Sequence, residues 1–479
     1  MQTVSVAIGV KNPARRIIAI PPRAGTQARE SSLPSARFLL ASGYRPTGVG
    51  SVETLGAELT SRSELVLVEF DGERKDLHFV ASLKSEHLAE VSYIAQGPEP
   101  VVYSAGQHHV DKRPWLTATR LPYLLETHDS FRQAITNSAA LASTASADDL
   151  GNPAPSSVQA MDLSESGQTI AIGIPHQFQI VNGETLKTQW NCNLERSPRT
   201  IYSEHKRLAD LHWTCACFVD PQKPALVLGA HANGPIFLFD TRQTQVARTL
   251  ELRSREASRA NALSGFAKAY EILLDCPSGP VRLCAPTKTA THPLTSTVLA
   301  LTRVPQRHST VLASTDDGMM LSLDLLRDQA SMLLKQAPND RTAGGVFASA
   351  LALQPREASL RVAIAAYGIH QEPTVSIWSR NDRGGETGMP LGHDPVSSAT
   401  AALTATTATA PATSIGLEES LTFEQRFRDH DELIIALAWH PSAVWIKSPA
   451  GATNQPLLAS LSADGRLVVR TAPVIVPGG

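Results

Sequence analysis

The sequence predicts an all-β fold, a seven-bladed β-propeller with degenerate repeats and loop insertions, formed as a single domain over residues 1–479. A unit made of an alternating apolar strand, a short apolar strand, a tight turn and another apolar strand recurs seven times along the chain. The alternation has the period of two that places every second side chain on one face of a strand. Because so small a sheet cannot bury both faces alone, radial stacking of the sheets is the arrangement that buries them.

The last unit, at about 425–472, is the clearest. Leu433, Ile435 and Leu437 alternate along its first strand, and Asp464–Gly465 provides a tight turn. That unit lacks a fourth strand, whereas the apolar run 4–10 has no unit of its own, so we expect 4–10 to complete the last blade and close the ring. The other expected blades lie at about 36–83, 85–122, 157–190, 205–250, 295–335 and 345–381.

Three insertions occupy the rest of the chain. Segments 124–156 and 382–420 are rich in small and polar residues, and we expect both to be flexible. In segment 252–292, apolar residues follow helical spacing, which predicts a short amphipathic helix that packs on the propeller or offers an apolar face to a partner. These residues are Leu263, Phe266, Ala267, Tyr270, Leu273 and Leu274.

The units resemble WD repeats, which carry a His in the connecting loop, an Asp in a tight turn and a strand that ends in Trp-Asp. The last unit has His430 and Asp464, with Arg470 in place of the Trp. The other matches are equally degenerate: His205 with Phe239–Asp240, Asp317–Gly318 with Leu323–Asp324, and Trp378–Ser379.

Three segments in the right order extend the resemblance. ASLSADGRLV (459–468) is similar to ASLSYDGRLV in the C-terminal blade of the EARP-and-GARP-complex-interacting protein family of WD-repeat proteins. ARFLLASG with ELVLVEFD (36–71) resembles the first blade of that family, and AHANGPIFLFDTR (230–242) resembles its ATANDTTLRGWDTR. The resemblance implies a cytoplasmic scaffold, recruited to endosomes or the trans-Golgi network, that binds the tethering complexes EARP and GARP in endosomal recycling and retrograde vesicle transport.

Two other functions stay open. FDTR (239–242) is a degenerate form of the W-D-x-R ending found in substrate receptors of cullin ubiquitin ligases, and another WD-repeat assembly scaffold is also possible. A propeller enzyme would need carboxylates or His side chains facing the central axis. The strands expected there, VLALTRV, ASALALQP and IIALAWHP, are mostly apolar and argue against an enzyme.

The candidates for chemistry have structural interpretations. Cys215 and Cys217 could share one face of a strand, but they lack a second pair of zinc ligands and are expected to be buried apolar groups. His430 with Asp464 and Ser460 or Ser462 contains the residue types of a hydrolase triad, yet we expect a structural network there and in the loop of His205. We expect no metal ligands at His108, His109, His292 or His308, turns at Gly344–Gly345 and Gly384–Gly385, and a solvated loop at 426–432.

Composition excludes further classes of function. Lys and Arg number 43 against 45 Asp and Glu, so the chain lacks the basic balance that nucleic acids and anionic membranes select. No Walker A or G-x-G-x-x-G motif is present, and we expect no catalytic residue, cofactor, metal or small-molecule substrate. Five cysteines suit a reducing compartment. The apolar run 4–10 has no preceding cation, which argues against a signal peptide, and we expect no direct membrane insertion.

Overall fold

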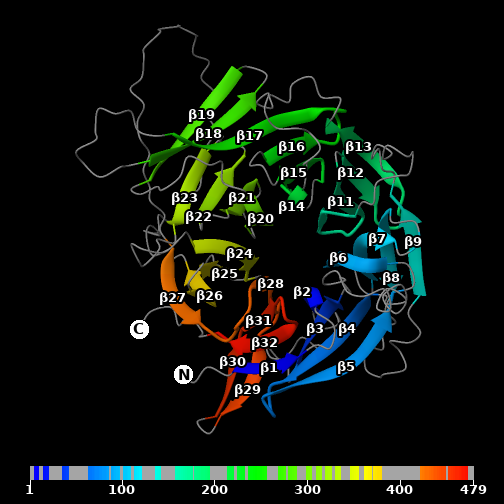
Figure 1. The fold of residues 1–479 in the computed structure, drawn as a ribbon, viewed down its shortest axis with the longest axis vertical. Coiled ribbons are helices and arrows are strands. Elements are labelled where there is room, and N and C mark those ends of the chain that lie inside the picture. The colour runs from blue at the N-terminus through cyan, green and yellow to red at the C-terminus, as the bar shows by residue number, and fades with distance from the viewer. Residues whose placement is uncertain are drawn as a thin grey trace, which may run out of the picture.

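The computed structural model of the chain has no helix among the residues that it describes, and its strands form seven small antiparallel sheets arranged as a β-propeller (Figure 1). The predicted fold class is therefore confirmed. The structure describes residues 5–9, 14–20, 35–42, 63–85, 88–97, 101–108, 110, 113–120, 135–141, 157–175, 177–194, 213–220, 224–231, 236–255, 268–276, 279–287, 298–304, 309–315, 319–325, 329–335, 346–354, 361–368, 371–379, 421–448 and 451–472.

Each blade is a sheet whose strands follow one another from the central axis outwards, except that the last blade ends on the N-terminal strand. Blade 1 contains β2 (Ala14–Ile20), β3 (Ser35–Ser42), β4 (Glu64–Asp71) and β5 (Asp76–Lys84). Blade 2 contains β6 (Leu88–Gln96), β7 (Val101–His108), β8 (Pro114–Arg120) and β9 (Ile135–Ala140). Blade 3 contains β10 (Ala160–Leu163), β11 (Thr169–Ile174), β12 (Gln177–Asn182) and β13 (Thr188–Asn193).

Blade 4 is longer and contains β14 (Trp213–Phe218), β15 (Leu226–His231), β16 (Ile236–Asp240), β17 (Val246–Arg255), β18 (Lys268–Cys276) and β19 (Gly279–Thr287). Blade 5 contains β20 (Val298–Arg303), β21 (Thr310–Thr315), β22 (Met319–Asp324) and β23 (Gln329–Lys335). Blade 6 contains β24 (Val346–Leu353), β25 (Arg361–Gly368), β26 (Gln371–Ser379) and β27 (Thr422–Phe427). Blade 7 contains β28 (Ile434–Trp439), β31 (Leu457–Ser462), β32 (Arg466–Thr471) and β1 (Ser5–Gly9), and a hairpin of β29 (Val444–Ser448) and β30 (Gly451–Gln455) lies between its first two strands.

The innermost strands form a closed ring. Contacts run from β2 to β6, β10, β14, β20, β24 and β28, and from β28 back to β2. These strands run in the same direction, because residues at their starts meet one another and so do residues at their ends. The amide of Trp213 donates to Gln159 Oε1 (3.1 Å) at the start of β14, and the amide of Phe218 donates to Asp162 Oδ2 (2.7 Å) at its end.

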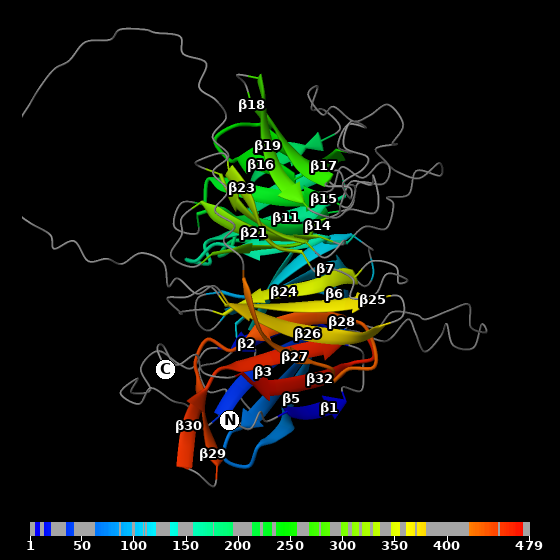
Figure 2. The same ribbon diagram turned by 90° about the vertical axis from the view of Figure 1, so that its left-hand side faces the viewer.

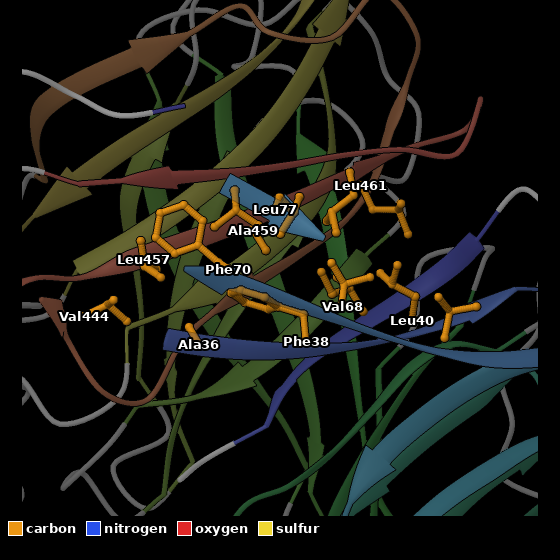
Figure 3. Packing of buried hydrophobic residues seen from close by; sticks show 14 of the residues in the cluster. Ala36, Phe38, Leu40, Val68, Phe70, Leu77, Val444, Leu457, Ala459 and Leu461 are labelled. Carbon is orange, nitrogen blue, oxygen red and sulfur yellow. The ribbon is translucent and has the colours of Figure 1, made fainter. Parts of the chain in front are cut away.

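The two ends of the chain meet in blade 7, where β1 pairs antiparallel with β32 from Ser5↔Arg470 to Gly9↔Arg466. Blade 7 is also joined to blade 1 by a shared apolar core (Figure 3). Phe38, Val68 and Phe70 of blade 1 lie in this core with Val444 of the β29–β30 hairpin and Leu457 of β31. Figures 1 and 2 both show the hairpin projecting from the ring beside blade 1. The imidazole of His440 adds a polar contact, with Nε2 3.2 Å from the carbonyl oxygen of Ile20.

Aromatic rings hold blade 3 against blade 4. The Trp213 side chain is 3% exposed and lies edge-on to Phe178 and Phe239, while its indole Nε1 donates to the carbonyl of Ile174 (2.9 Å). Close approach depends on glycines, because a Cβ added at Gly229 would lie 2.7 Å from Trp213 Cζ3. The Phe239 ring stands where a WD repeat has Trp and stacks on Phe178 at 4.5 Å.

The structure corrects the interpretation of segment 252–292. The predicted helix is wrong, since Tyr270, Leu273 and Leu274 lie on strand β18, whereas Leu263, Phe266 and Ala267 lie outside the described residues. β18 pairs with β17 from Thr249↔Asp275 to Arg255↔Ala269, and β19 pairs with β18 in turn. The physical reason is that the open edge of β17 supplies hydrogen-bonding partners, while an isolated helix of about one dozen residues is marginal in water.

The limits of several expected blades also differ from the structure. Blade 1 begins at β2, upstream of the expected start at 36, and the insert 124–156 contributes β9 to blade 2. The insert 382–420 lies within blade 6, between β26 and β27, rather than between two blades. β27 is held by a buried ion pair, in which Arg361 of β25 donates from Nε (2.9 Å) and Nη2 (2.5 Å) to Glu424 Oε2.

Removal of residues 1–10 is expected to lower the free energy of unfolding by several kcal/mol, at about 0.5–1.5 kcal/mol for each hydrogen bond that β32 loses. Thermal unfolding followed by circular dichroism measures the loss. A synthetic peptide covering residues 1–12, added to the truncated protein, is expected to restore part of it. An unchanged melting temperature in the truncated protein would contradict the pairing of β1 with β32 as the ring closure.

Substitution of Gly229 with Ala is expected to cost about 1–3 kcal/mol, because the new methyl group would overlap the Trp213 ring. Denaturant unfolding of Gly229→Ala, Trp213→Phe and the double variant measures the coupling. Phenylalanine lacks the indole atoms nearest to Gly229, so the added cost of Gly229→Ala is expected to shrink in the Trp213→Phe background. Costs that simply add would contradict the contact.

Candidate functional site

The first candidate is the polar network of His430 in blade 7. His430 Nε2 lies 2.7 Å from Ser460 Oγ, and Nδ1 lies 3.0 Å from Ser462 Oγ. The Ser462 hydroxyl donates to Asp464 Oδ1 (2.5 Å), at a turn where Gly465 adopts a φ of 84°. The network joins the approach to β28 with the turn between β31 and β32. Ser460 and Ser462 are fully buried, so neither hydroxyl is open to a substrate as a hydrolase nucleophile must be.

Arg470 extends this network into the core. Its guanidinium is fully buried, donates from Nη2 to Ser460 Oγ (2.6 Å), faces the Asp429 carboxylate at 3.5 Å and lies 4.6 Å from the centre of the Phe427 ring. Among the described residues, its Nε and Nη1 have no hydrogen-bond partner. Burial lowers the pKa of Arg470 to about 10. Of the segment 426–432, expected to be a solvated loop, Phe427 and His430 are buried, whereas Arg426, Arg428, Asp431 and Glu432 are exposed.

The second candidate is the axis of the propeller, called the central channel below, around which the seven innermost strands are arranged. Near the starts of β10 and β14, Tyr93 of β6 bridges these two strands: its hydroxyl donates to the carbonyl of Gln159 and lies 3.3 Å from that of Thr214. Arg16 of β2 lies over the Tyr93 ring at 4.4 Å and donates from Nε to the carbonyl of Ser92 (2.7 Å). Burial raises the pKa of Tyr93 although the charge of Arg16 opposes this shift, so the phenol is neutral at physiological pH.

At the end where the strands finish, the channel carries charges of both signs. Asp162 of β10 accepts the Phe218 amide, and Arg303, the last residue of β20, donates from Nη1 to the carbonyl of Leu163 (3.4 Å). Burial raises the pKa of Asp162, and the positive charge of Arg303 and the Phe218 amide partly counteract this rise. The guanidinium of Arg303 therefore reaches past β14 to β10 across this end of the channel.

An apolar hollow of about 550 Å³ occupies the same end on the other side of the channel. Its walls are residues 17–19 of β2, Gln96 at the end of β6 with Gly97 after it, Ala352 of β24, and residues 437–439 and Pro441 at the end of β28. The indole Nε1 of Trp439 donates to the carbonyl of Ala352 (3.2 Å), which fixes the ring in the wall. The channel end thus has one apolar half and one charged half.

The Cys215–Cys217 pair lies on β14 beside this channel. Burial raises the pKa of Cys215 to about 12 and that of Cys217 well above its usual range, so both thiols are protonated at neutral pH. Among the described residues, no group of three His, Cys, Asp or Glu side chains could hold a metal ion.

The remaining sequence candidates are scattered. Arg242 of FDTR, whose side chain is 72% exposed, binds Asp240 of its own motif through Nε–Oδ1 (2.8 Å) and Nη2–Oδ2 (2.7 Å). His108 stacks on Trp115 at 4.3 Å between ring centres. Outside the described residues lie His109, His205, His292, His308, Asp317–Gly318, Gly344–Gly345 and Gly384–Gly385.

Sequence reasoning missed the polar residues of the channel. Arg16 lies in ARRIIAI, which was not assigned to a blade because it precedes the expected start of blade 1. Its β-branched run, followed by the strand at 35–42, is the signal that could have identified β2 as an innermost strand. Nothing local marks Tyr93 or Asp162, because their roles depend on strands far apart in sequence.

Comparisons with known proteins do not assign a function. The sequence matches no protein-family model and no curated protein. Within the described part of the chain, no helix has the length and apolar character needed to cross a bilayer. The β-propeller architecture itself is typical of non-enzymatic scaffolds with repeated sequence units.

His430 gives the structure a measurable pH dependence. Burial, strengthened by the positive charges of Arg470 and Arg466, lowers the pKa of His430 from 6.5 to about 4. Between these two values the unfolded chain binds a proton that the folded chain does not, so the free energy of unfolding falls as the pH falls, by up to about 3 kcal/mol.

Urea unfolding at several pH values between 7 and 4 tests this dependence. We expect the stability difference between the wild type and His430→Gln to narrow toward acidic pH, because the variant has no imidazole to protonate. His78→Gln, which removes an exposed imidazole on β5, serves as the control and is expected to follow the wild type. If His430→Gln also runs parallel to the wild type, the lowered pKa is wrong.

Proposed function

We propose that this protein is a non-enzymatic WD-repeat scaffold in the cytoplasm, recruited to endosomes or the trans-Golgi network, where it binds subunits of the tethering complexes EARP and GARP. Its cellular role would be endosomal recycling and retrograde vesicle transport. The observation that carries the proposal is the ordered resemblance of segments 36–71, 230–242 and 459–468 to the EARP-and-GARP-complex-interacting family. These three segments lie in blades 1, 4 and 7 of one propeller.

The character of the described polar groups favours a scaffold over an enzyme. The buried network of His430 links strands of blade 7, and its serine hydroxyls have no access to solvent. The carboxylate of Asp162 in the channel is likewise buried and accepts the Phe218 amide. Such contacts position strands, whereas general acid–base catalysis needs groups in reach of a substrate.

A substrate receptor of a cullin ubiquitin ligase is the second candidate. Its specific observation is the exposed side chain of Arg242 just after β16, which is held at the surface of blade 4 by the buried carboxylate of Asp240. Phe239 replaces the Trp of that motif and is fully buried between blades. Of the motif residues 239, 240 and 242, Arg242 is thus the one with a side chain exposed to a partner.

Affinity purification of the tagged full-length protein from cells, with identification of co-eluting proteins, tests the proposal. We expect several tethering-complex subunits in comparable amounts. Deletion of 256–292 removes the β18–β19 hairpin and returns blade 4 to four strands, and we expect it to reduce capture if that extension contacts the complex. Its melting temperature provides the control for folding.

Arg242→Gln separates the second candidate from the first. Recovery of a cullin adaptor that is lost in Arg242→Gln, without tethering subunits, would replace the proposed function with that of a ligase receptor. Absence of both kinds of partner would leave the propeller fold in place and overturn the assignment to tethering complexes.

A further inference from the structure

The end of the central channel where the innermost strands finish brings together two chemically different walls. Arg303 is the last residue of β20, just as Trp439 is the last residue of β28 and Gln96 the last of β6. Since the innermost strands run in the same direction, these last residues share one end of the channel. Arg303 therefore stands opposite the apolar hollow that Leu437 and Trp439 help to form.

Arg303 uses one of its donor groups on a described residue. Its one hydrogen bond to a described residue runs from Nη1 to the carbonyl of Leu163, at 3.4 Å, which leaves Nε and Nη2 without a partner among the described residues. The Asp162 carboxylate is within range of its charge but forms no ion pair with it within 4 Å. Instead, Asp162 Oδ2 accepts the Phe218 amide. A guanidinium whose Nη1 binds a carbonyl, and whose Nε and Nη2 have no partner in the described part of the chain, is suited to a carboxylate, which it can bind through two parallel hydrogen bonds.

Arg16 carries a second positive charge on the innermost strands, nearer to the other end of the channel. The described partners of its guanidinium are a carbonyl and an aromatic ring, which carry no net charge. Among the innermost-strand side chains that the structure describes, Arg16 and Arg303 carry positive charge and Asp162 is the one carboxylate. An anion that enters the channel is attracted, and low-dielectric walls strengthen this attraction.

The apolar hollow sets a second requirement for the ligand, which must also carry an apolar group. A volume of about 550 Å³ lies within the range of sites that enclose small ligands or several side chains, and its walls offer aliphatic and aromatic surface. A phosphate or a free carboxylic acid would leave this apolar surface uncovered. A peptide in which an acidic residue adjoins a bulky apolar residue would satisfy both halves of the channel end.

We propose that this end of the central channel is a peptide-binding site that takes an acidic side chain on Arg303 and a neighbouring Leu or Phe side chain in the hollow beside Leu437 and Trp439. The inference rests on the proposed function in taking the ligand to be a segment of a partner protein. It goes further by stating the chemistry of that segment and the face of the propeller that binds it.

Fluorescence anisotropy with a panel of fluorescein-labelled nonapeptides tests the site. Each peptide carries Asp or Glu next to Leu or Phe, and each has a matched peptide with Asn or Gln in place of the acid. We expect the wild-type protein to bind acidic members at least tenfold more tightly than their amide partners, and this preference to weaken between 50 and 500 mM salt.

Variants assign the preference to particular residues. Arg303→Gln is expected to abolish the discrimination between acid and amide, whereas Leu437→Ser is expected to weaken both peptides of a pair. Arg74→Gln removes an equal charge from an exposed turn of blade 1 and is expected to behave as the wild type. A purely structural role of Arg303 would weaken both peptides equally, and melting temperatures identify any unfolded variant.

The outcomes are distinct. If no peptide pair is discriminated by the wild type, or if Arg303→Gln keeps the discrimination, the channel site is overturned. If the tagged wild-type protein still captures tethering subunits in that case, the proposed function stands without it. If acidic peptides are selected through Arg303 but tethering subunits are not captured, the site stands and the identity of the partner complex fails.

Discussion

The structure depends on one constraint, that a sheet of four short strands buries its two faces only between two neighbouring sheets. Each blade is therefore stable as a member of a closed ring, and the ring can close only if blade 7 packs on blade 1. In this protein, several contacts between segments far apart in the sequence close the ring. β1 pairs with β32, the β29–β30 hairpin buries Val444 against blade 1, and His440 binds the end of β2. Because N- and C-terminal segments form one sheet, opening the ring requires the loss of a whole strand pairing.

The same constraint explains why the fold tolerates degenerate WD-repeat motifs. Phe239 replaces the usual Trp in blade 4, yet it stacks on Phe178 of blade 3 and keeps the seam between blades aromatic. Arg470 replaces it in blade 7, where a buried guanidinium lies against Phe427, Ser460 and Asp429. Burial of a charge is costly unless it is paired. That cost is consistent with the lowered pKa of Arg470. Phe239 and Arg470 thus occupy the Trp position of the repeat with different side-chain contacts. The repeat is therefore recognised by the spacing of its strands more than by the identity of any residue.

Strand periodicity made the fold class predictable, because alternating apolar residues and tight turns are local properties. The position of 4–10 could be inferred as well, since it is an apolar strand beside a blade with one strand too few. The helix predicted within segment 252–292 is wrong at residues 268–276 because apolar residues three and four apart can also occur in a strand, and only the open edge of β17 decides between the two. The ion pair of Arg361 and Glu424 anchors β27. Its two residues are 63 positions apart, on either side of a low-complexity insert, so no local sequence pattern predicts the pair.

The channel shows a further limit of local reading. An innermost strand such as VLALTR looks apolar as a string, and this apolar character was an argument against chemistry at the axis. Yet a ring brings the last residues of seven such strands together, so a single Arg or Asp in each of a few strands produces a concentrated polar site. Arg303 and Asp162 are isolated charges in their own segments, and they face each other only because β10, β14 and β20 are consecutive in the ring. In a propeller, composition along one strand thus says little about the axis. The chemistry at the axis depends on the residues that all the innermost strands place at the same height along it. At the height of Arg303, these residues provide a cation, a carboxylate and an apolar hollow.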